Sequence, residues 1–166
     1  LLGLAYESHV WSEVEKAGGI RRFSGARMPD VSPQSQMPLN GQRLDQVASI
    51  ALPANNGLDT TVLSYRVPAG WDGIIVSLVN YWTGTGFVDG SGNLTWRLLI
   101  NEYYIKGYGN VRFTYGSLQN RYPLEGAYFP IRQGDLITYQ VNHAVASGLT
   151  TGNIVVGFGG YTYPTV

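Results

Sequence analysis

Hydrophobic and polar residues alternate in short runs over most of the chain from residue 57 onward. Residues 59–67 (DTTVLSYRV) alternate and end at a Pro-Ala-Gly turn, and residues 73–82 (GIIVSLVNYW) are mainly apolar and β-branched. Further runs of this kind cover residues 94–101, 103–108, 111–115, 126–131, 136–143 and 153–163. Alternation bounded by Gly, Pro and Asp turns is typical of strands, and none of these runs has a helical period.

About eight short strands at nearly regular spacing predict an all-β domain over residues 57–166. Such a domain is expected to form two packed antiparallel sheets, a β-sandwich of the jelly-roll kind. A closed barrel is the competing architecture, because it uses strands of the same length and spacing.

The pattern over residues 1–56 is different. Apolar residues at helical spacing within residues 8–16 favour a short helix of two turns, whereas three prolines within residues 28–39 favour extended or irregular backbone. Apolar residues recur more often than in an ordinary solvated tail. We interpret residues 1–56 as an extended arm that orders against another surface, with a loose tail as the alternative. The candidate arm contacts are Leu4, Trp11, Ile20, Phe23, Val31, Leu39, Leu44 and Val47.

Composition narrows the classes of partner. The 166 residues include 11 basic and 11 acidic side chains, so the net charge is zero. A neutral chain argues against nucleic-acid binding, which needs a basic face. No apolar run reaches the roughly 18 residues of a membrane helix, so no membrane contact is expected. Charged residues are only 13% of the chain, about half the usual 25%, which indicates a surface that faces other protein.

The chain offers little for catalysis. It has no cysteine, so thiol chemistry and Cys-bound metals are excluded. His143 could join Asp135 and a serine in a triad on paper, but no G-x-S-x-G motif occurs and a strand-end histidine bonded to backbone is the simpler interpretation. Residues 89–93 (DGSGN) resemble the front of a calcium loop, yet Ile100 occupies the position of the required glutamate. We therefore expect no enzyme, no metal and no cofactor.

The aromatic residues are the better candidates for function. Adjacent residues of a strand point to opposite faces, so Tyr103 and Tyr104 cannot both enter the core of the domain. Exposed aromatics suit either a protein interface or a sugar-stacking platform, and the low charge favours the interface. The candidate interface or glycan aromatics are Trp82, Trp96, Tyr103, Tyr104 and Tyr108.

Four turn-containing segments, in this order, carry a resemblance to a known family. They are V-P-A-G at 67–70, I-N-E-Y-Y-I at 100–105, P-I-R-Q-G-D at 130–135 and G-G-Y-T-Y at 159–163. With them, residues 59–164 resemble the jelly-roll domains of virion proteins of tailed bacteriophages. This family implies no active site, but a viral structural protein: a capsid decoration (cement) protein, or a neck or fibre component.

The resemblance also implies partners and a location. Members commonly form homotrimers through the jelly roll and grip the shell or a neighbour with an N-terminal extension. The expected protein is thus part of a virion assembled in the host cytoplasm, and its partners are its own copies and the major capsid protein. The alternative is a carbohydrate- or receptor-binding module of a tail fibre or neck.

Overall fold

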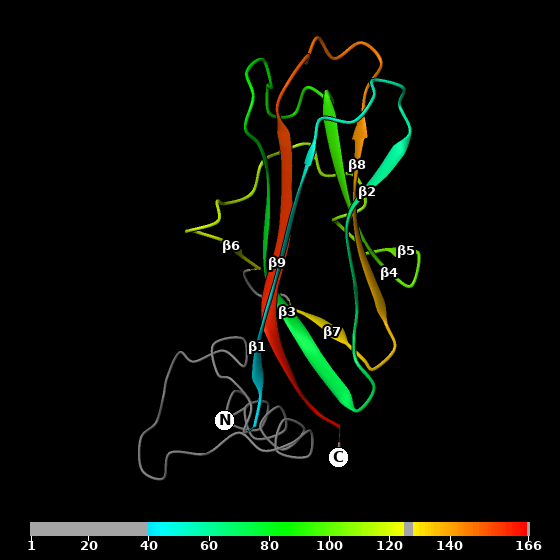
Figure 1. Cartoon of the computed structure of the whole chain (residues 1–166), viewed down its shortest axis with the longest axis vertical. Coiled ribbons are helices and arrows are strands. Elements are labelled where there is room, and N and C mark those ends of the chain that lie inside the picture. Colours follow the sequence, from blue (N-terminus) through cyan, green and yellow to red (C-terminus); the bar gives the residue numbers. More distant parts are fainter. Residues whose placement is uncertain (1–39, 125–127, 166) are drawn as a thin grey trace, which may run out of the picture.

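The structure, a computed structural model, describes residues 40–124 and 128–165. These residues form nine strands and no helix (Figure 1). The strands are β1 (Gln42–Ala51), β2 (Asp59–Arg66), β3 (Trp71–Trp82), β4 (Leu94–Ile100), β5 (Tyr103–Tyr104), β6 (Tyr122–Pro123), β7 (Phe129–Ile131), β8 (Leu136–His143) and β9 (Asn153–Pro164).

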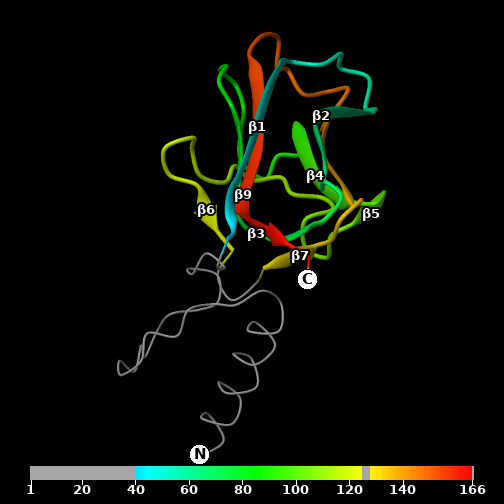
Figure 2. The same ribbon diagram turned by 60° about the horizontal axis from the view of Figure 1, so that its bottom comes forward.

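The strands form two antiparallel sheets that pack face to face (Figures 1 and 2). The five-stranded sheet has the order β1-β9-β3-β6, and β7 also pairs with β3. The four-stranded sheet has the order β2-β8-β4-β5. The prediction of an all-β, antiparallel sandwich is confirmed, and the sheets do not close into one barrel.

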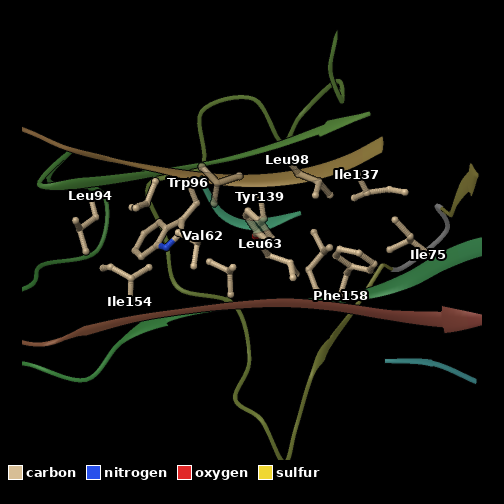
Figure 3. Close-up of a cluster of buried hydrophobic side chains, with 14 of the residues drawn as sticks. Val62, Leu63, Ile75, Leu94, Trp96, Leu98, Ile137, Tyr139, Ile154 and Phe158 are labelled. Carbon is tan, nitrogen blue, oxygen red and sulfur yellow. The ribbon is translucent and has the colours of Figure 1, made fainter. Parts of the chain in front are cut away.

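The core lies between the two sheets. In β8, strict alternation directs Ile137, Tyr139 and Val141 inward, and the opposite layer contributes Phe158 from β9 (Figure 3). Trp96 of β4 is completely buried among them. Burial of each such large side chain contributes about 1.5–3 kcal/mol before the cost of ordering the chain.

The sandwich begins earlier in the chain than expected. β1 pairs with β9 along its whole length, from Gln42 opposite Thr162 to Ala51 opposite Asn153. The proposed boundary at residue 57 is therefore wrong, because it assigns a complete strand of the sheet to the arm. The alternation of apolar and polar residues in β1 is weak, since its inward positions include a glutamine and an alanine. The sequence pattern therefore did not predict this strand.

Because the sandwich begins earlier, two of the candidate arm contacts, Leu44 and Val47, lie within β1. Leu44 is 4% exposed and belongs to the core of the domain, so it is not available to a partner. Val47 points to the opposite side of β1 and is 42% exposed. The other six, together with the expected helix at 8–16, lie outside the described residues; they are Leu4, Trp11, Ile20, Phe23, Val31 and Leu39.

The segment between β4 and β7 is less regular than its sequence predicts. The expected strand at 103–108 contains only the two residues of β5, because the chain turns at Gly107, whose φ is 86°. The expected strand at 111–115 forms only single bridges, from Val111 to Trp96 and from Tyr115 to Asn80. β6 was not expected from the sequence.

The corrected boundary predicts different results for two deletions. Removing residues 1–39 leaves all nine strands, so this variant should unfold cooperatively on heating. Removing residues 1–56 deletes β1, and loss of Leu44 alone costs about 2–5 kcal/mol. Thermal unfolding followed by circular dichroism should show that only the longer deletion destroys the fold; a cooperative transition in both variants would contradict the assignment of β1 to the core.

Candidate functional site

The family-like segments at 67–70, 100–105 and 130–135 lie together at one end of the sandwich. The amide of Val67 donates to the Asp135 carbonyl, and the Gly134 amide donates back to the Val67 carbonyl, both at 2.9 Å. Asn101 reaches the same turn, because its side-chain amide donates to Asp135 Oδ1 at 2.6 Å. Turn chemistry therefore accounts for these segments: 67–70 and 130–135 connect one sheet to the other, and 100–105 connects β4 to β5 within the four-stranded sheet.

The two candidate tryptophans are core residues. Trp96 is completely buried and Trp82 is 9% exposed. The ring of Phe87 contacts both edge to face, with centroids 5.3 Å from Trp96 and 6.5 Å from Trp82. Neither indole presents a face to solvent, so the expectation that Trp82 or Trp96 forms an interface or sugar platform is wrong.

The two tyrosines of β5 are the exposed members of the candidate set. Tyr103 is 80% exposed and Tyr104 is 56% exposed. The turn before them has positive φ at Asn101 (51°) and Glu102 (70°), the geometry of a two-residue hairpin that returns the chain antiparallel to β4. The Arg97 guanidinium lies 6.0 Å from the centroid of the Tyr104 ring. The hairpin thus presents two large aromatic side chains at the edge of the four-stranded sheet.

Tyr108 belongs to a row of four aromatic rings that we call the aromatic ladder: Phe129, Tyr108, Tyr115 and Tyr122. Ring centroids in the ladder are 5.3 Å apart for Tyr108 and Phe129 and 6.5 Å for Tyr108 and Tyr115. Tyr115 and Tyr122 stack at 4.8 Å. Through these ring contacts, the irregular segment after β5 packs against β6 and β7, and Tyr108 is half-buried. Sequence periodicity could not reveal it, since its members come from loops and very short strands.

Beneath the ladder lies a buried polar pair. The Tyr139 hydroxyl donates to Asn80 Oδ1 at 3.3 Å, and the Asn80 side-chain amide donates to the Phe113 carbonyl at 2.8 Å. Burial raises the pKa of Tyr139 well above its usual value, and the neighbouring Tyr115 and Tyr108 raise it further. Burial also raises the pKa values of Tyr108 and Tyr115. All three tyrosines are therefore held in the neutral, protonated form.

His143 is built into the structure at the other end of the domain. Its Nδ1–H donates to the Pro53 carbonyl at 2.9 Å, so Nε2 accepts from the Ser147 hydroxyl. Both side chains are buried, and Asp135 precedes β8 whereas His143 ends it. The triad of His143 and Asp135 considered from the sequence is not assembled, and the histidine instead connects the β1–β2 loop to the β8–β9 loop.

The calcium-like loop is also explained by internal bonds. The Asp89 carboxylate accepts the Thr114 amide at 3.0 Å and the Thr114 hydroxyl at 3.3 Å. Across residues 40–124 and 128–165, no three His, Asp or Glu side chains come together as a metal site would require. The same residues include no helix long and apolar enough to cross a membrane.

No protein-family model matches the chain, and a search of the curated proteins found no match either. Of the five aromatic candidates, the two tyrosines of β5 are exposed and Tyr108 is half-buried.

The buried tyrosines predict a loss of stability in alkali. Because folding raises their pKa values, the unfolded chain releases protons first above a pH of about 10, and the free energy of unfolding falls as pH rises further. Near pH 8, Tyr139→Phe should lower the free energy of unfolding by about 1 kcal/mol, because the hydrogen bond to Asn80 is lost. As pH rises from about 9 to 11, the free energy of unfolding should fall less in this variant than in the parent, because residue 139 no longer titrates. Urea unfolding at each pH measures both effects; parallel decline of the two proteins would contradict the assignment.

Proposed function

We propose that the chain is a non-enzymatic structural protein of a tailed-bacteriophage virion, which decorates or cements the head and forms homotrimers through its sandwich domain. The strand order supports the jelly-roll part of this proposal. β6 and β7 pair with adjacent stretches of β3, so the nine strands act as eight if these two count as one interrupted strand. Every connection except that from β4 to β5 then crosses from one sheet to the other, which supports the proposed jelly-roll order.

The observation that carries the proposal is the exposed tyrosine pair of β5. Tyr103 and Tyr104 place two large rings on a two-residue edge strand, where the described residues of the chain leave them largely exposed. Tyrosines that combine a large apolar ring with a polar tip are enriched in protein interfaces and often dominate their binding energy. We assign this edge as the contact between copies of the chain.

The arm supplies the attachment in this proposal. Residues 1–39 contain six of the apolar candidates, from Leu4 to Leu39, and join the sandwich directly before β1. Each aliphatic side chain buried on a partner contributes about 1.5–3 kcal/mol before ordering costs. The partners are neighbouring copies and the major capsid protein.

Replacing both β5 tyrosines should weaken self-association. In the double variant Tyr103→Ser, Tyr104→Ser, we expect association at least 10-fold weaker, because exposed interface tyrosines contribute about 1–2 kcal/mol each. Light scattering should show the parent at three times the 18.2 kDa of one chain and the variant shifted to monomer. Leu58→Ser is the matched control, since Leu58 is 66% exposed in the β1–β2 loop. A monomeric parent would contradict the trimer.

The deletion of residues 1–39 tests attachment separately. The shortened protein should still fold and self-associate, yet fail to co-sediment with phage heads that lack the decoration. Undiminished co-sedimentation would show that the arm does not hold the protein on the particle.

A second function is favoured by the same exposed rings. Tyr103, with Tyr104 supported by Arg97, could stack on a sugar of a host polysaccharide, as a receptor-binding module of a fibre or neck would. A glycan array distinguishes the two: saturable binding to the parent that is lost in the Tyr103→Ser, Tyr104→Ser variant supports this second function.

A further inference from the structure

Among the described residues, β1 forms the longest regular edge of either sheet. It is the last strand of the five-stranded sheet, and it pairs with β9 over ten residues without a register shift. The edges formed by β5, β6 and β7 are only two or three residues long. The edge strand β2 has a register shift between Thr61 and Leu63. A long, regular edge is a template for pairing with another strand.

Every second residue of β1 directs its backbone N–H and C=O away from β9. The Leu52 amide donates to the Gly152 carbonyl at 2.9 Å, which continues the β1–β9 register by one residue. Bonded and non-bonded positions alternate in an antiparallel pair, so the even-numbered residues of β1 bond to β9. The odd-numbered residues are all exposed, and no other backbone group of residues 40–124 and 128–165 bonds to them. They are Arg43, Asp45, Val47, Ser49 and Ala51.

The second half of this edge lacks the features that normally prevent pairing between edges, which are charges, prolines and bulges. Residues 46–51 (QVASIA) contain no charged residue and no proline, and Val47 is 42% exposed. The two charged residues of β1 lie near its start, and the Asp45 carboxylate already pairs with Arg121. A second strand therefore meets no unpaired charge along residues 46–51.

We propose that β1 pairs antiparallel with β1 of a second copy of the chain, so that two five-stranded sheets become one continuous sheet. Two identical edges pair about a two-fold axis. With this axis at Val47, each odd-numbered residue of β1 lies opposite an odd-numbered residue of the second copy. Every N–H and C=O of the edge then has a partner. A shift by two residues would leave one residue of each strand without a partner in the other.

The side chains of the outer face fit the same register. Val47 lies opposite Val47 of the second copy, which gives an apolar contact at the axis. Asp45 lies opposite Ser49 of the second copy, and Arg43 lies opposite Ala51. No like charges therefore face one another, an arrangement that would destabilise the pair.

This contact goes beyond the one proposed for β5, which lies at an edge of the other sheet. A two-fold contact at β1 would join trimers in pairs, and it does not depend on the virion role. Hydrogen bonds formed on association replace bonds to water, so the net gain from each is small. We therefore expect the pairing at high protein concentration.

Disulfide trapping tests the pairing and its register, since the chain has no cysteine of its own. Directly opposed residues of a bonded pair have Cα atoms about 5.5 Å apart, a distance that a disulfide spans. Val47→Cys, oxidised at high concentration, should give a covalent dimer of twice the 18.2 kDa of one chain on a denaturing gel.

Ser49→Cys is the matched control for this experiment. Its two copies would lie four residues apart along the pair, about 14 Å, so it should remain monomeric on the same gel. Equal dimer yields from the two variants would overturn the register. An edge occupied by another segment, such as residues 1–39, gives no Val47→Cys dimer, and that result would overturn the proposal.

Lysine substitutions test the contact in the Tyr103→Ser, Tyr104→Ser variant, so the result does not depend on the proposed trimer. Val47→Lys places two like charges opposite each other and should weaken dimerisation at least about 10-fold. Ser49→Lys adds the same charge opposite Asp45 of the second copy and should not weaken it. Sedimentation equilibrium at high concentration measures both, and thermal unfolding shows that each variant is folded. Equal weakening by the two lysines would overturn the proposal.

Discussion

The close approach of β1 and β3 to the central strand β9 is the constraint on which the rest of the structure depends. A Cβ at Gly157 would lie 2.6 Å from the Gln46 carbonyl oxygen of β1, and one at Gly160 would lie 1.9 Å from the Ile74 carbonyl oxygen of β3. Only glycine permits both approaches. They fix the register of three strands, and with that register Phe158 points into the core.

The sequence predicted the sandwich wherever alternation was strict. The bounds expected for β8 match the structure because every second residue from Ile137 to His143 is buried. β1 was missed because Gln46 and Ala48 stand at inward positions, where a strand usually carries larger apolar side chains. Its partner β9 supplies the missing burial, and such a contact between distant segments is not contained in a local pattern.

The exposure of the candidate aromatic residues could be predicted from the sequence only in part. Two adjacent tyrosines in a strand must face opposite ways, so exposure at Tyr103 or Tyr104 followed from the sequence alone. The burial of Trp82 and Trp96 did not, because alternation gives two faces without saying which one meets the other sheet. The pairing of Arg121 with Asp45 depends on the fold itself, since only the assembled sheet brings the two residues together.

The antiparallel pairing of β1 with β9 also determines how the domain responds to mechanical force. The start of β1 and the end of β9 lie at the same end of the sheet, where Gln42 faces Thr162. Tension between the chain before β1 and the chain after β9 therefore unzips the pair one residue at a time. Tension between the chain before β1 and the loop before Asn153 loads all ten pairs together in shear. The direction of pull thus determines whether the strand peels away or resists as a unit.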